Sequence, residues 1–211
     1  GGHDDAVVMA DGTGTWAINQ ATTTQETTLA QGDDVVPVSQ ATADKHSAAQ
    51  LAFVTNLVNT NGEIKNATIV ANTPTQGDDY GSEYTFQLTG PITVPENFTT
   101  GDGSTVPIAA TVLYSTQRAS LATDSTAADL SGYVDKDQVT DWSQIRSVII
   151  KIPKIPAKAA TGRFIFNGVI PDMVNQGNRT GYIASGFYMD GAKLSLQDKD
   201  ASASLTITGT S

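Results

Sequence analysis

The chain has 211 residues, a formal net charge of −10 and no cysteine, and these three facts exclude several classes of function. Without cysteine there is no disulfide, no thiolate nucleophile and no thiolate metal site. A nucleic-acid backbone or an anionic membrane would repel a chain with 12 Lys and Arg against 22 Asp and Glu, so we expect neither as a partner. No stretch approaches the roughly 20 apolar residues of a transmembrane helix, so we expect no membrane insertion.

The composition favours a protein that works outside the cell. Charged residues make up only 16% of the chain, below the quarter that is typical of soluble domains, and Thr, Ser, Asn, Gln and Gly take their place. The chain opens with Gly1 and Gly2 instead of Met. We therefore interpret residues 1–2 as a remnant of processing or expression, and the rest as a fragment of a larger protein.

The first clear structural signal is a predicted β-hairpin. Residues 48–58 could form a strand or a helix by periodicity alone. They are followed by Asn61 and Gly62, a pair that supplies the positive φ angles of a tight hairpin turn. Residues 64–71 then alternate and end at the turn residues 72–74. We expect the two segments to pair with each other.

The rest of the chain predicts more strands and few helical turns. Short apolar or aromatic runs bounded by turn residues predict strands at 84–88, 108–114, 147–152, 163–170, 182–188 and 205–208. Helical turns are expected at 44–50, capped by Asp44, and at 140–145, capped by Asp141, with a surface loop at 120–128.

Many strands with no amphipathic helix between them predict an all-β fold, an antiparallel β-sandwich of immunoglobulin-like or jelly-roll type. We expect one domain over residues 3–211, with two smaller β domains divided near 115–135 as the alternative. The sequence leaves open whether residues 3–47 belong to this sandwich or cross to a neighbouring molecule. We expect a monomer.

Two stretches resemble segments of Gram-positive cell-surface adhesins. The first is LVNTNGEIKNATIVANTP with the acidic turn GDDYGSEYTFQLTGP, and the second is VTDWSQIRSVIIKIPKIPAKAATGRFIFNGVIP. The second is similar to a D-W-S turn, an apolar strand, a Pro-Ala bend and another apolar strand, with the motif at Asp141, Trp142, Ser143, Ile145, Ile155, Pro156 and Ala157. The resemblance covers roughly residues 48–190.

Such modules belong to wall-anchored proteins of lactic acid bacteria and their relatives, often beside mucin-binding repeats. The resemblance therefore implies an extracellular location at the cell surface or cell wall and an adhesive or stalk-like role. It implies no catalytic residue and identifies no ligand.

Aromatic side chains are the candidates for ligand binding. A sugar ring stacks on an aromatic face while nearby amides and carboxylates bond its hydroxyls. The candidates are Tyr80, Tyr182, Tyr188 and Trp16, and Tyr80 stands in an acidic turn. Trp142 precedes an apolar strand and is expected in the core. The partner expected on these grounds is a host mucin, glycan or matrix protein.

Two Gly-Asp turns are candidates for a calcium site, with Asp78, Asp79 and Asp102 as the ligands. Calcium takes oxygen ligands from carboxylates and from backbone carbonyls in such turns. Neither turn has the full spacing of an EF-hand loop. We expect no other cofactor.

The sequence contains no recognisable catalytic motif, so we expect a protein that is not an enzyme. His3 and His46 are the two histidines, and no Gly-x-Ser-x-Gly motif accompanies them. Paired carboxylates, which glycoside hydrolysis requires, fall in predicted turns at Asp33/Asp34, Asp78/Asp79, Asp135/Asp137 and Asp198/Asp200.

Three functional hypotheses follow: an adhesion module, a stalk domain, and a fragment of a carbohydrate-active enzyme. Lys65 and Lys151 are further candidates, for a Lys-Asn isopeptide bond that would replace the missing disulfides.

Overall fold

The computed structural model describes residues 8–10, 13–18, 21–26, 29–31, 34–36, 40–44, 51–59, 62–121, 131–162, 164–170, 179–189, 192–193 and 201–208. Side chains are described for most of residues 62–188 within these ranges. The described residues form strands and two short 3-10 helices, η3 (Lys136–Gln138) and η4 (Trp142–Gln144). Among them, no helix has the length and apolar character needed to cross a bilayer.

One sheet has eight strands. Its order is β2 (Thr13–Ile18), β3 (Ala21–Glu26), β7 (Leu51–Asn59), β1 (Val8–Ala10), β4 (Leu29–Gln31) and β5 (Asp34–Val36), and β14 (Phe164–Val169) joins β7 to β9 (Gln87–Leu88). The pairing of β1 with β7 is parallel, and the other pairings are antiparallel.

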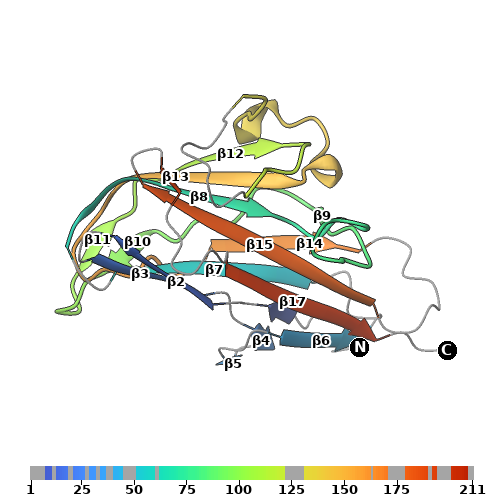
Figure 1. Ribbon diagram of the computed structural model, residues 1–211, viewed down its shortest axis with the longest axis horizontal. Coiled ribbons are helices and arrows are strands. Elements are labelled where there is room, and N and C mark those ends of the chain that lie inside the picture. Colours follow the sequence, from blue (N-terminus) through green and yellow to red (C-terminus); the bar gives the residue numbers. More distant parts are fainter. Residues whose placement is uncertain are drawn as a thin grey trace.

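The second sheet has seven strands and contains most of the regular pairing (Figure 1). Its order is β12 (Thr111–Ser115), β13 (Ser147–Ile155), β8 (Ile64–Asn72), β15 (Arg179–Met189), β17 (Ala201–Thr208) and β6 (Gln40–Asp44), with β16 (Ala192–Lys193) beside β15. Only β6 and β17 are parallel. A separate two-stranded ribbon joins β10 (Asn97–Thr99) to β11 (Thr105–Pro107).

The core lies between the two sheets, which confirms the predicted all-β sandwich. Alternate residues of a strand face the same side of its sheet, so the apolar alternation in the sequence directs one face of each strand inward. The buried cluster includes Ile69 and Ala71 of β8, Val148 and Ile150 of β13, and Phe164 and Phe166 of β14. Residues of both sheets thus share one apolar interior.

The inward-facing set shifts by one position at a single rung shared by two strands. Ile64 and Ala67 of β8 are both buried, although three positions separate them, and so are Ile152 and Ile155 of β13. Between them, the paired register of the two strands skips one position, at Pro153 of β13 and at Asn66 of β8, which has φ of 52°. Because both strands change face at this same rung, the register is kept and the ends of both strands still reach the core.

The predicted hairpin between residues 48–58 and 64–71 is wrong. Both segments are strands, β7 and β8, but β7 belongs to the eight-stranded sheet and β8 to the seven-stranded sheet. The central strand β8 is paired on one side with β13 and on the other with β15. The chain therefore passes from one sheet to the other between β7 and β8.

The other predicted strands are present with shifted ends, except that 84–88 contains only the two-residue strand β9. The predicted helical turn at 140–145 is confirmed as η4, where the carboxylate of Asp141 accepts a hydrogen bond of 3.0 Å from the backbone N–H of Ser143. Trp142 is only half-buried, and its ring packs edge-on against Tyr114 with centroids 4.7 Å apart. Asp44 ends β6, and residues 45–50 lie outside the described residues.

Residues before position 48 contribute to both sheets, with β1 to β5 in one and β6 in the other. Each sheet also combines strands from both sides of residues 115–135: β8 lies between β13 and β15, and β7 pairs with β14.

We predict that Gly181→Ala destabilises the fold. A Cβ at Gly181 of β15 would lie 2.4 Å from Cζ of Tyr84, whose ring is buried, so the core must shift. We expect a loss of about 1–3 kcal/mol in the free energy of unfolding, measured by urea denaturation. Gly90→Ala is the matched control, because a Cβ there meets no atom within 4 Å. Equal stability of the two variants would contradict this packing.

Candidate functional site

One buried carboxylate organises the turn that follows β8. Both oxygens of Asp78 accept backbone hydrogen bonds: Oδ2 from the N–H of Thr75 at 3.0 Å, and Oδ1 from the N–H groups of Tyr80 at 3.1 Å and Ser82 at 3.0 Å. The side chain is fully buried. Gly77 and Gly81 in this turn have φ near +80°, where glycine is favoured. The turn therefore wraps around the Asp78 carboxylate.

Arg118 joins this turn to a distant segment. Its Nη1 lies 3.4 Å from Oδ2 of Asp78 and donates to the carbonyl of Thr73 at 2.6 Å, and its Nη2 lies 3.8 Å from Oδ1 of Asp79. Burial alone would raise the pKa of Asp78. The hydrogen bonds from Ser82 and Thr75 and the charge of Arg118 outweigh burial, so that this pKa is lowered.

Arg118 belongs to residues 116–121, which we call the strap. The side-chain amide of Asn72, at the end of β8, pairs with the backbone of Ala119: Nδ2 donates to the carbonyl and Oδ1 accepts from the N–H, both at 2.8 Å. The hydroxyl of Ser147 on β13 donates to the carbonyl of Gln117 at 2.5 Å. The strap is thus fastened to two neighbouring strands.

Beneath the strap lies a second, smaller apolar cluster. It contains the buried residues Val70, Ile149 and Tyr188 of the seven-stranded sheet, with Leu113, Ala119, Leu121 and Tyr133 packed against it. In a strand, the residues next to inward-facing ones point to the opposite face of the sheet. The strap therefore shields apolar residues on the outer face of this sheet from water.

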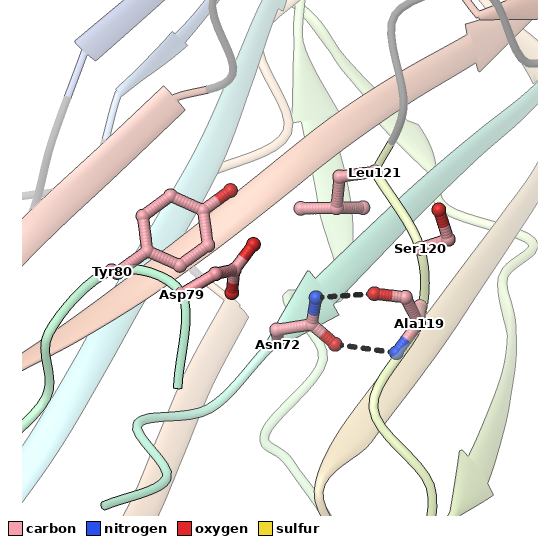
Figure 2. Close-up of a pocket in the computed structure, with 6 residues that line it drawn as sticks. All are labelled: Asn72, Asp79, Tyr80, Ala119, Ser120 and Leu121. Atoms are coloured by element: carbon pink, nitrogen blue, oxygen red, sulfur yellow. Dashed lines mark hydrogen bonds between the residues drawn. The ribbon is translucent and has the colours of Figure 1, made fainter. Parts of the chain in front are cut away.

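The strap and the Asp78 turn enclose a pocket of about 310 Å³. It is lined by Asn72, Asp79, Tyr80, Ala119, Ser120 and Leu121. Figure 2 shows Tyr80 and Asp79 on one side, the strap residues on the other and Asn72 between them. Its volume is at the lower end of the roughly 300–1,000 Å³ of small-molecule sites.

The lining combines one aromatic ring with several polar groups. The ring of Tyr80 is half-buried, and the Asp79 side chain is 84% exposed. Within the described part of the chain, the second Nδ2 hydrogen of Asn72 and the hydroxyl of Ser120 make no hydrogen bond. The pocket thus offers an aromatic face, a carboxylate acceptor, an amide donor and a hydroxyl.

Of the predicted site residues, Tyr80 and Asp79 line this pocket, and Asp78 lies in the same turn. Tyr182 is half-buried on β15, where its backbone N–H donates to Oγ of Ser82, and it does not line the pocket. Tyr188 is 2% exposed in the cluster beneath the strap, so a ligand does not reach its ring. Trp16 lies in β2, and its side chain is outside the described residues.

The predicted calcium ligands lie in two separate turns. Asp78 already binds protein donors on both oxygens, so a cation there would have to displace them. Asp102 accepts from the N–H of Ser104 at 2.9 Å and from the hydroxyl of Thr100 at 2.5 Å. Among the described residues, no three His, Asp or Glu side chains are grouped to hold a metal ion. Calcium binding at these turns stays a prediction.

The described carboxylate pairs have local roles of the kind predicted for turns. Asp78 organises its own turn, and Asp135 caps η3 by accepting from the N–H of Asp137 at 2.8 Å. The pairs at 33/34 and 198/200 involve residues outside the described part of the chain. Lys65 and Lys151 are exposed, which does not fit an isopeptide bond formed beside a buried acid.

Sequence reasoning missed the residues that the strap and β8 contribute to the pocket. From the sequence, Asn72 is expected to be a turn residue after a strand. Ser120 and Leu121 are expected to belong to a polar loop. Asn72 and Ala119 are 47 positions apart, so no local signal links them.

No protein-family model matches the chain, and no curated protein sequence matches it. Among solved structures, the collagen-binding subdomain of the Enterococcus faecalis surface protein ACE is similar over 80% of this chain and 93% of its own, with 7% identity and a TM-score of 0.32. A second structure of ACE covers 98% of this chain and 80% of its own, with 8% identity and a TM-score of 0.35.

The third is AggA, the major subunit of aggregative adherence fimbriae type I from Escherichia coli. It matches 92% of this chain and 99% of its own at 12% identity, with a TM-score of 0.28. Likeness at this level assigns the chain to no family and carries no ligand over to it.

We predict that Asp78 makes the stability of the protein sensitive to acid. Its pKa is lowered in the folded state, so its contribution is present above the unfolded value of about 3.9 and is lost as pH falls through the lower folded value. We expect the unfolding free energy of the natural chain to fall more steeply between about pH 5 and pH 2 than that of Asp78→Asn.

The matched control is Asp102→Asn. The pKa of Asp102 is also lowered, chiefly by hydrogen bonds from Thr100 and Ser104, but its carboxylate is exposed and solvent screens its contribution. Chemical denaturation at several pH values provides the comparison. The same acid loss in the natural chain and in Asp78→Asn would contradict the role of the buried carboxylate.

Proposed function

We propose that this chain is a non-enzymatic adhesion module of a cell-surface protein and that it binds a host glycan, such as one carried by a mucin, in the pocket between Tyr80 and the strap. The observation that carries the proposal is the lining itself: an aromatic ring, a carboxylate and a side-chain amide line one small pocket.

The polar groups suit the hydroxyls of a neutral sugar. The carboxylate of Asp79 accepts hydrogen bonds, and the second Nδ2 hydrogen of Asn72, which bonds no described residue, is a donor, so both can bond the hydroxyls of one ring. The ring of Tyr80 offers a face for the C–H groups of a pyranose. A sugar hydroxyl can donate to the carboxylate and accept from the amide at the same time. A group that only accepts or only donates would leave one of these partners without a hydrogen bond, so the site would bind it more weakly.

The site is held ready before a ligand arrives. Asp78 binds the backbone N–H of Tyr80, and Asn72 is held by two hydrogen bonds to the strap. Because both sides of the pocket are tied to the sheet, little ordering is required on binding, and the loss of conformational entropy is small.

The surface location rests on composition and on the sequence resemblance. A chain with 16% charged residues and many hydroxyl and amide side chains fits an extracellular module, and residues 141–157 resemble adhesin segments. The wall-anchored location and a matrix-protein partner are parts of the same hypothesis. A stalk domain is the alternative outcome.

The test is a glycan and mucin binding screen on the purified chain, followed by titration of the best ligand. We expect Tyr80→Ala to weaken binding by about tenfold, because it removes the aromatic face; stacking of a nucleobase on such a ring contributes on the order of 1–3 kcal/mol, and we assume the lower end for a sugar. Asp79→Asn should also weaken it, because the amide replaces one acceptor by a donor. Tyr80→Phe should retain most of the affinity.

Asp102→Asn is the control, because Asp102 lies in a different exposed turn. Equal affinity of Tyr80→Ala and the natural chain would rule out this pocket, and a blank screen would favour the stalk. Titrations with calcium and with a chelator test the predicted cation. Loss of binding under chelator alone would place calcium at the site.

A further inference from the structure

A second pocket, of about 400 Å³, opens at the flank of the sandwich beside β12. Its apolar lining includes Ile92, Val94, Ala110 and Val112. Val94, Ala110 and Val112 are only partly buried, and they pack directly against the main core. The pocket is thus an opening through which the apolar interior meets solvent.

The edge of a sheet borders this opening. β12 is the last strand of the seven-stranded sheet and pairs only with β13 on its inner side, as Figure 1 shows. On its outer side, Tyr114 exchanges two backbone hydrogen bonds with Val134, at 2.7 and 2.9 Å. Alternate residues of a strand direct their N–H and C=O groups to the same edge, so those of Val112 also face outward.

Immediately beyond Val134, the described residues of η3 stay close to β12 but do not bond its backbone. Residues 135–138 form the cap and the turn of η3 instead of continuing along β12. Among the described residues, none bonds the outward backbone of Val112. An exposed edge of this kind is a template on which another strand can pair.

The rim of the pocket carries net negative charge. Asp135 and Asp137 line it together with Lys136, and all three are exposed. The whole chain carries a net charge of −10, which attracts cationic partners over longer distances. A strand laid along β12 would therefore be favoured if it carried basic side chains.

We propose that this flank binds an extended, basic segment of a partner protein, which pairs with β12 at Val112, next to the position where Val134 already bonds Tyr114. Its backbone bonds the outward N–H and C=O of Val112. Alternate apolar side chains enter the opening between Val94 and Val112, and Lys or Arg residues between them face Asp135 and Asp137. The site is separate from the Tyr80 pocket and does not depend on the function proposed for it.

The probe is a synthetic nine-residue peptide that alternates lysine and valine, titrated by calorimetry at physiological ionic strength. The matched control alternates glutamate and valine, and we expect it to bind at least tenfold more weakly. Two further peptides carry N-methyl groups on the valine nitrogens or on the lysine nitrogens. Because alternate N–H groups of a strand point to one edge, one of these peptides should lose at least tenfold in affinity and the other should not.

Two variants of the chain test whether the peptide binds at this flank. Val112→Pro removes the outward N–H without removing a hydrogen bond to β13, a position at which edge strands tolerate proline, and should weaken peptide binding about tenfold. Asp137→Lys reverses one rim charge at an exposed position. This variant should bind the lysine peptide more weakly and the glutamate peptide more tightly than the natural chain does. The proposal therefore stays testable if Val112→Pro does not fold.

The proposal is overturned if the lysine peptide does not bind. It is also overturned if neither N-methylated peptide, or neither variant, changes the affinity, because the attraction is then charge alone without strand addition. Sedimentation of the natural chain tests whether a second copy of the chain binds at this edge instead. A dimer that Val112→Pro dissociates would make a second copy of the chain the occupant of this edge, in place of a basic partner.

Discussion

The buried carboxylate of Asp78 is the constraint on which the outer surface of the seven-stranded sheet depends. It accepts hydrogen bonds from three backbone N–H groups of its own turn and lies beside the guanidinium of Arg118. A buried carboxylate without such partners would cost several kcal/mol, so the turn and the strap are held in the arrangement that supplies them. Tyr80 and Asp79 take their positions from this arrangement.

The strap has a structural role that does not depend on any ligand. A sheet in a sandwich usually buries one face and exposes the other, but Val70, Ile149 and Tyr188 place apolar side chains on the outer face as well. The strap covers them and is fastened by polar contacts at Asn72 and Ser147. The pocket forms where this cover meets the Asp78 turn, so the same contacts stabilise the fold and shape the candidate site.

The two proposed sites differ in the kind of recognition that they permit. The Tyr80 pocket presents side chains to a small polar ligand, and its specificity would come from the placement of a few hydrogen-bonding groups. The flank at β12 presents backbone groups and an apolar opening, which suit an extended chain. One sandwich can carry both, since the first lies over the face of a sheet and the second at its edge.

The sequence by itself determined the class of the fold, most of the strands and the local caps. Alternating apolar residues specify strands because one face of each strand must be buried. The helical turn after Asp141 could be predicted because its cap is a hydrogen bond between residues close in sequence. Tyr80 and Asp79 were found as candidates because their turn is also local. Only the tertiary structure decided that β7 and β8 lie in different sheets, since an Asn-Gly turn permits a hairpin without requiring one.

Only the tertiary structure, likewise, buried Tyr188 under the strap and brought Asn72 to Ala119. These contacts join residues far apart in the chain, and their free energy comes from packing that the local pattern does not encode. The place of β12 at the edge of its sheet follows from the order of the strands, which depends on the whole sheet.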